Sequence, residues 1–109
     1  MNSALERSLF ILSSVEFQNE NIILGNSDSY VMIDELIDDS VYLIGRELLS
    51  RRYASDLRGK LEDLMLLLKD RGAEIDDMNN YDIINKSLFW REVGELSGDI
   101  LCSIEKNKI

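Results

Sequence analysis

Two stretches of this 109-residue chain concentrate carboxylates in the absence of any Lys or Arg. Residues 28–39 contain five acids and residues 74–82 contain four. In chain order, the nine are Asp28, Asp34, Glu35, Asp38, Asp39, Glu74, Asp76, Asp77 and Asp82. Twelve acids and twelve bases balance one another in the rest of the chain, so the net charge of −9 belongs to these two stretches. Grouped carboxylates can transfer protons, bind cations or attract basic protein surfaces.

The sequence favours the last of these three chemistries. The chain has no His, which removes the most frequent general base and the imidazole ligand of zinc sites. Residues 77–82 offer oxygen ligands but lack the sharp-turn Gly and the final Glu of a calcium-binding EF-hand loop. Acids near the single Cys102 disfavour its thiolate, and no Ser is arranged with a His or Lys that would activate it. We therefore predict no enzymatic activity, no metal and no cofactor.

Two tyrosines accompany the carboxylates. Tyr42 falls within the acidic arc of a predicted helix, and Tyr81 lies inside the second acidic stretch. An aromatic among carboxylates is typical of a binding surface where the ring anchors a partner and the charges steer it. The alternative is a solvated helix face whose acids favour the helix N-terminus, which explains Asp28 better than Asp38 and Asp39. We predict a partner-binding surface formed by Asp34, Glu35, Asp38, Asp39, Tyr42, Glu74, Asp76, Asp77, Tyr81 and Asp82.

Amphipathic helices must position these residues. Apolar residues recur at steps of three and four over three segments, which predicts helices at about residues 27–49, 55–71 and 87–106. The first of these three begins at Ser27 or Ser29. Its inward face is predicted to carry Tyr30, Ile33, Ile37, Val41, Ile44 and Leu48.

The N-terminal segment predicts a fourth long helix. Ser3 and Glu6 match a capping box, which predicts a helix over about residues 4–17, although residues 15–17 and 21–24 could instead form short strands. Together the segments predict one all-α domain over residues 1–109, folded as a small antiparallel four-helix bundle. A further short helix or strand is expected near residues 17–24 and 81–85.

Three glycines and one tryptophan carry more local predictions. Gly72 is predicted to cap the C-terminal end of the helix over residues 55–71. Gly94 and Gly98 predict the close approach of a neighbouring helix or a local kink, with a shallow groove entered by a partner as the alternative. Trp90 is expected at the edge of the apolar face of the last helix, with its indole N–H directed outward.

Composition bounds the class of protein. No run of eighteen apolar residues is present, and the first fifteen residues lack the basic region and cleavage site of a signal peptide. One Cys cannot form an internal disulfide, so a cytoplasmic location is expected. The localised negative charge predicts a basic protein partner and argues against nucleic acid and membrane surfaces as partners.

In size, charge and lack of catalytic groups, the chain resembles the small acidic helical immunity proteins and other inhibitors of bacteria and phages. No single motif carries this resemblance. It implies an inhibitor, an immunity protein or antitoxin, that neutralises a basic nuclease-type toxin by covering its active or nucleic-acid-binding surface, as a monomer or weak homodimer. One alternative is a regulatory or adaptor module that docks or dimerises through Leu49, Leu66 and the Gly94–Gly98 region. Another is a phage anti-defence protein that mimics nucleic acid.

Overall fold

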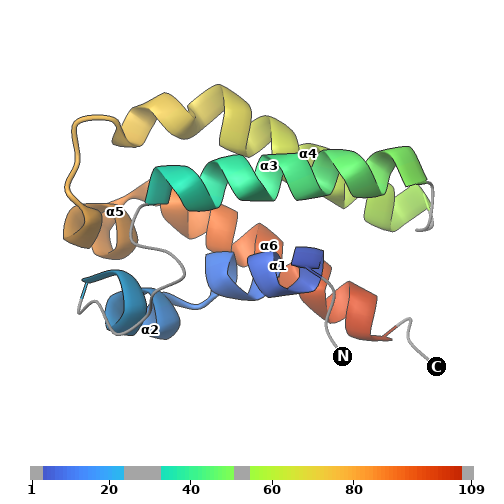
Figure 1. Ribbon diagram of the computed structural model, residues 1–109, viewed down its shortest axis with the longest axis horizontal. Helices are drawn as coiled ribbons and strands as arrows, with labels where there is room; N and C mark the ends of the chain where they lie inside the picture. The colour runs from blue at the N-terminus through green and yellow to red at the C-terminus, as the bar shows by residue number, and fades with distance from the viewer. Residues whose placement is uncertain (1–3, 24–32, 51–54, 107–109) are drawn as a thin grey trace.

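The computed structural model describes residues 4–23, 33–50 and 55–106, and within these ranges the chain is built from helices without any strand (Figure 1). The all-α prediction is confirmed, and the strand alternative for residues 15–23 is wrong. The predicted caps Ser3, Ser27 and Ser29, and also Asp28 and Tyr30, lie outside the described residues. The elements are α1 (Ala4–Ser13), α2 (Val15–Gln18), the π-helical η1 (Asn19–Ile23), α3 (Ile33–Ser50), α4 (Ser55–Arg71), the 3₁₀-helical η2 (Gly72–Ile75), α5 (Asn80–Lys86) and α6 (Leu88–Lys106).

Four of these helices enclose the core. α1 packs against α6 and α3, and α4 packs against α3 and α6. Figure 1 shows α3 and α4 side by side, with α1 crossing in front of α6. The short helices form a separate group at one end, where α5 contacts η1, α2 and α6. The prediction of a four-helix bundle is therefore not confirmed, because six α-helices are present within the described residues and two of them belong to this group.

The apolar faces predicted for the segments at about residues 55–71 and 87–106, which form α4 and α6, are largely confirmed. In α4, Leu57, Leu61, Leu64 and Leu68 are all buried, at the predicted spacing. In α6 the buried apolar residues are Phe89, Trp90, Val93, Ile100 and Ile104. Four buried Leu at i, i+4, i+7 and i+11 form one continuous stripe on a helix of 3.6 residues per turn, which is why periodicity predicted this face.

The inward face of α3 differs from its prediction. Its buried residues are Ile33, Leu36, Ser40 and Ile44, whereas the predicted Ile37, Val41 and Leu48 are only half-buried. The face is rotated because α1 and α4 contact α3 from two directions. Ser40 is accommodated by hydrogen bonds: its hydroxyl donates to the Leu36 carbonyl at 2.7 Å and lies 3.2 Å from the Ser8 hydroxyl.

The predicted first helix is broken at Ser14, so the boundary at residue 17 is wrong. Ser14 has extended backbone angles, and its hydroxyl accepts a hydrogen bond from the Phe17 N–H at 3.1 Å, which makes it the N-cap of α2. The side chain of Gln18 then folds back, and its amide donates to the Ile11 and Leu12 carbonyls at 2.6 and 3.0 Å. These carbonyls lie in the last turn of α1, where a helix lacks intrahelical donors.

The same glutamine also accepts a hydrogen bond from Trp90. The indole Nε1–H donates to Gln18 Oε1 at 2.8 Å, and both side chains are buried. The prediction that this N–H points outward is therefore wrong: it points inward, because a buried amide satisfies it. One buried Gln thus joins the end of α1, the helix α2 and the start of α6.

Gly94 and Gly98 confirm the prediction of close helix approach. A Cβ at Gly94 would lie 3.3 Å from the Leu12 carbonyl oxygen, and one at Gly98 would lie 3.6 Å from Ser13 Cβ. The end of α1 therefore occupies the space that these glycines leave. The predicted cap at Gly72 is wrong, since the chain continues from Gly72 directly into η2.

Candidate partner-binding surface

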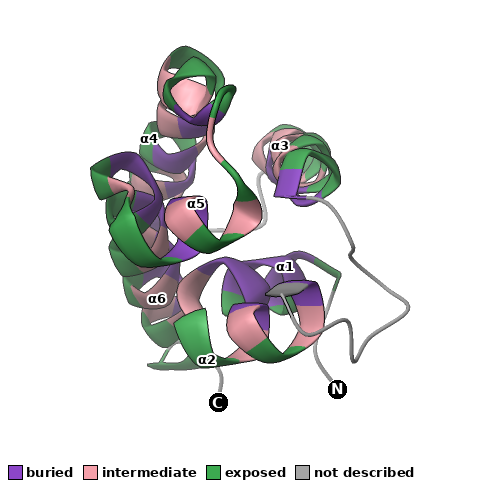
Figure 2. Cartoon of the chain, turned by 90° about the vertical axis from the view of Figure 1, so that its left-hand side faces the viewer, coloured by how far each residue is buried: buried purple, intermediate pink, exposed green. Residues whose placement is uncertain are grey.

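The outer face of α3 presents the first group of predicted site residues. Asp34, Glu35, Asp38 and Asp39 are all exposed, on the side of the helix opposite its buried residues. Figure 2 shows this arrangement, with the exposed side of α3 turned away from α1 and α4. The i,i+4 spacing places Asp34 beside Asp38 and Glu35 beside Asp39, so like charges are neighbours along the face.

No ion pair neutralises these four carboxylates within the described residues. The ion pairs of the described chain lie elsewhere and join Lys60 to Asp99 at 3.0 Å, Arg71 to Glu74 and Glu92, and Lys86 to Asp82. Like charges at i,i+4 destabilise a helix by about 0.2–0.5 kcal/mol per pair. The helix dipole favours Asp34 and Glu35, which lie in the first turn of α3, but Asp38 and Asp39 lie beyond that turn and gain no such stabilisation.

Tyr42 lies on the same side of α3 and is 64% exposed. The guanidinium of Arg46, one turn further along, lies 5.7 Å from the centre of its ring. The ring is thus flanked by a cation as well as by acids, which the prediction of an aromatic surrounded by carboxylates did not include. This cation–π contact restrains the ring but leaves most of it open to solvent.

The second acidic stretch is divided by its own ion pairs. Glu74 accepts from Arg71 Nε at 2.6 Å, and this guanidinium lowers the pKa of the Glu74 carboxyl. Asp82 lies 3.4 Å from Lys86 Nζ, and the same ammonium lies 6.0 Å from the centre of the Tyr81 ring. Glu74, Asp82 and Tyr81 therefore have internal partners, and they contribute less to a free negative surface than predicted.

Asp76 and Asp77 remain exposed, in the turn between η2 and α5. This turn is anchored by Ile75, which is buried, and by Asn79, whose side-chain oxygen accepts from the Asp82 N–H at 2.8 Å and caps α5. The two Asp side chains therefore project from a segment whose backbone is held at both ends.

The two acidic stretches meet at a hollow of about 270 Å³, called here the Asp34–Asp76 hollow. Asp34 from α3 and Asp76 from the turn both line it. Its other lining residues are Ile33, Ile75, Met78, Asn80 and Ile83. Because Ile33, Ile75 and Ile83 are buried, the hollow combines an apolar floor with two carboxylates and an amide at its rim. The sequence could not place Asp34 beside Asp76, since their proximity depends on the order in which the helices pack.

Sequence reasoning missed Ile75, Met78 and Asn80 as parts of this surface. The sequence does contain a signal for Ile75, because it is the only Ile in the acidic stretch 74–82 and an isolated aliphatic residue among acids indicates a buried position. Met78 and Asn80 carried no such signal. The residues of the adaptor alternative are not gathered: Leu49 is 85% exposed at the end of α3, and Leu66 lies eleven residues into α4. In adjacent antiparallel helices that separates them by roughly 15 Å along the axis.

Comparison with protein-family models, curated proteins and solved structures found no match to the chain. Across residues 4–23, 33–50 and 55–106, no three acidic or thiol side chains converge to hold a metal ion. No helix in those ranges has the length and hydropathy needed to cross a bilayer.

Proposed function

We propose that the protein is a stoichiometric inhibitor, an immunity protein or antitoxin, that binds a basic nuclease-type toxin and covers its active or nucleic-acid-binding surface. One observation carries the proposal. The outer face of α3 holds four exposed carboxylates without an ion pair in the described chain, and this face continues through Asp34 to Asp76. A helix that tolerates unneutralised like charges is best explained by a cationic partner.

In this proposal the inhibitor acts by occlusion. Asp38 and Asp39 pair with Lys and Arg side chains that otherwise hold nucleic-acid phosphates, and Tyr42 supplies packing area. The Asp34–Asp76 hollow receives one basic side chain, whose aliphatic stem lies on the apolar floor while its charged head lies between the two carboxylates. The charge also accelerates association, toward about 10⁸ M⁻¹s⁻¹ at low salt. The complex forms in the cytoplasm, before the toxin reaches its substrate.

Two double charge reversals test the proposal. The partner is first isolated on the immobilised protein at low salt, and its affinity is then measured for the variants. Asp38→Lys with Asp39→Lys is expected to weaken binding at least about 100-fold, because attraction becomes repulsion. Glu62→Lys with Asp63→Lys is the matched control: it changes the charge equally at two adjacent exposed positions of α4, and it should change affinity less than about fivefold.

Circular dichroism checks that both variants keep their helices. Equal loss of affinity in the two variants would show that only net charge matters and would contradict a specific surface on α3. Unchanged affinity in the first variant would contradict the inhibitor proposal itself. A complex that persists in molar salt would likewise oppose an electrostatic surface, since the Debye length is then about 3 Å.

A second candidate is the adaptor or dimerisation module, and the exposure of Leu49 and Leu66 favours it. Light scattering separates the two functions. A homodimer that survives high salt and is disrupted by Leu49→Ser supports the adaptor, whereas a monomer over the accessible concentrations excludes dimerisation through this residue. Competition between double-stranded DNA and the protein for a captured partner tests the nucleic-acid mimic, which uses the same acidic surface on a different target.

A further inference from the structure

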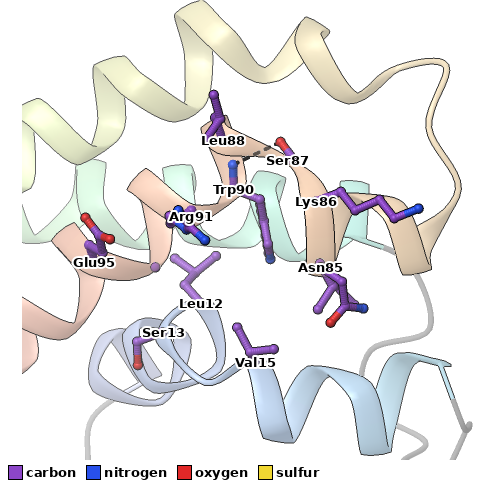
Figure 3. Close-up of a pocket in the computed structure, with 12 residues that line it drawn as sticks. Leu12, Ser13, Val15, Asn85, Lys86, Ser87, Leu88, Trp90, Arg91 and Glu95 are labelled. Carbon is purple, nitrogen blue, oxygen red and sulfur yellow. Dashed lines mark hydrogen bonds between the residues drawn. The ribbon is translucent and has the colours of Figure 1, made fainter.

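A second cavity is distinct from the Asp34–Asp76 hollow, and no residue lines both. It has a volume of about 440 Å³ and opens between the α1–α2 junction and the α5–α6 junction (Figure 3). Leu12 and Val15 line one side, and Ile84, Trp90 and Arg91 line the other. None of the ten predicted partner-binding residues lines it. Its volume falls in the range of about 300–1,000 Å³ that is usual for small-molecule sites.

The inner wall of this cavity is formed by apolar side chains, and the polar Ser13, Asn85 and Ser87 that also line the cavity already have hydrogen bonds within the chain. Leu12, Ile84 and Trp90 are buried, and Val15 is half-exposed at the opening. The one polar atom of the indole already donates to Gln18, and the Leu12 carbonyl already accepts from Gln18. A polar ligand group placed against this wall would lose its hydration and gain no hydrogen bond, so the wall favours an apolar body.

Among the residues that the structure describes, the rim carries one cation without an ion pair. Arg91 is exposed and forms no ion pair within the described residues, and Figure 3 places its side chain at the opening beside Trp90. Lys86 differs, because it pairs with Asp82 and extends away from the cavity. Glu95 lies at the α6 end of the opening with its carboxylate turned away from Trp90. The planar guanidinium of Arg91 can donate two parallel hydrogen bonds to a carboxylate.

We propose that this cavity binds a small molecule that joins an apolar body to one carboxylate, such as a medium-chain aliphatic acid. The body contacts Leu12, Val15 and Trp90, and the carboxylate accepts hydrogen bonds from Arg91. A free small molecule is the chosen occupant because α1, α2, α5 and α6 all contribute to the walls and the volume suits one such ligand. The inference is independent of the inhibitor function, since the two sites share no residue.

Trp90 gives this proposal a direct readout, because it is the only Trp of the chain and it lines the cavity. Sodium octanoate is titrated into the full chain below its micellar concentration, with octanamide and octylammonium as ligands of equal length. Octanoate is expected to change the Trp90 fluorescence saturably and to bind roughly threefold to fivefold more tightly than octanamide, as one charge-assisted hydrogen-bonded pair at an exposed rim allows. Octylammonium is expected to bind more weakly than either. Carbon-labelled methyl groups of Val15 and Ile84 should shift over the same range.

Variants assign the effect to the cavity. Arg91→Gln should reduce octanoate affinity to that of octanamide, whereas Arg46→Gln, an equal charge change on α3, should leave it unaltered. Val15→Phe, at a half-exposed position that tolerates size, should weaken octanoate and octanamide together by filling the opening. This pattern supports the proposal.

Three results would overturn it. The first is an absence of saturable octanoate binding in the unaltered protein. The second is equal affinity for octanoate and octanamide, or equal losses in the Arg91 and Arg46 variants, because the carboxylate would then not be recognised by Arg91. The third concerns the source of the carboxylate. A leucine-terminated tripeptide that binds more tightly than octanoate, and loses affinity when its C-terminus is amidated, would assign the cavity to the end of a protein chain.

Discussion

The junction of α1, α2 and α6 and the outer face of α3 both carry polar side chains, but they use them in opposite ways. At the junction, the buried Gln18 satisfies two carbonyls of α1 and the indole N–H of Trp90. On α3, exposed carboxylates have no ion pair within the described chain and stand next to like charges. The first arrangement stabilises the fold. The second leaves its interactions for another molecule.

This difference separates two kinds of substitution. Changes at the junction should lower the free energy of unfolding and should affect binding only through the fold. Changes on the α3 face should leave stability nearly unaltered and should act on the partner complex. The substitutions that test this division are given in order of decreasing expected change in the free energy of unfolding.

The largest effect is expected for Gln18→Leu. The substitution keeps the volume similar but removes three hydrogen bonds, and it leaves a buried indole N–H and one or two buried carbonyls without partners. We expect the free energy of unfolding to fall by about 3 kcal/mol, since each unsatisfied buried group costs about 1–3 kcal/mol. Urea denaturation followed by circular dichroism measures it.

Glu16→Leu is the control for that substitution, because it places the same side chain at an exposed position of the same short helix. Its effect should stay within about 0.5 kcal/mol. If Gln18→Leu lowers the free energy of unfolding by less than about 1 kcal/mol, the junction repacks without its glutamine. The claim that the polar groups of the junction stabilise the fold would then be wrong.

A smaller effect of opposite sign is expected for Ser97→Ala. The Ser97 hydroxyl is buried on α6 and has no hydrogen-bond partner in the described part of the chain. Removing it should raise the free energy of unfolding by up to about 1 kcal/mol, because the group is desolvated without compensation. Ser8→Ala serves as its counterpart and should lower stability by about 1 kcal/mol, since it breaks the contact with Ser40. A clear loss of stability in Ser97→Ala would reveal a partner for this hydroxyl.

On the α3 face, Asp38→Asn with Asp39→Asn should raise the free energy of unfolding by no more than about 0.5 kcal/mol, through relief of the repulsion from Asp34 and Glu35. The control is Glu62→Gln with Asp63→Asn on α4, which removes the same charge elsewhere. Thermal unfolding of the two variants measures the difference. A loss of more than about 1 kcal/mol in the α3 variant would show that these carboxylates serve the fold, which would remove the contrast with the junction.

Local patterns predicted a large part of this fold. The faces of α4 and α6 followed from apolar spacing, because each is buried along one continuous stripe. Ser87, predicted to open the last helix, indeed accepts from the Trp90 N–H at 3.2 Å. The exposure of the α3 carboxylates followed from the same helical phase. The N-cap of α2 also has a local signal in Ser14, but the apolar pattern continues through this residue and predicts one uninterrupted helix.

The remaining features depend on tertiary contacts. Gln18 reaches six and seven residues back along the chain and across to α6, so no periodicity could indicate its role. The meeting of Asp34 with Asp76 requires the start of α3 to lie beside the turn that precedes α5. Both arrangements follow from which helices are neighbours, and amphipathic patterns leave that order undetermined.

The final prediction compares an acid that has an internal partner with acids that have none. Hydrogen bonding from Arg71, more than charge alone, lowers the pKa of the Glu74 carboxyl, and Glu74 in turn raises the pKa of Arg71. Because the folded pKa of Glu74 lies below its unfolded value of 4.5, this pair stabilises the fold above that pH, and its contribution is lost as the pH falls from 4.5 toward the lower folded value. Carbon-detected NMR titration of the carboxyl measures the pKa, and Arg71→Gln should return it toward 4.5, whereas Lys60→Gln, which removes a base paired to Asp99, should not. An unchanged Glu74 pKa in the Arg71 variant would mean that Glu74 belongs with the unpaired acids, and the free negative surface would then include Glu74 together with Asp76 and Asp77, while Asp82 stays paired with Lys86.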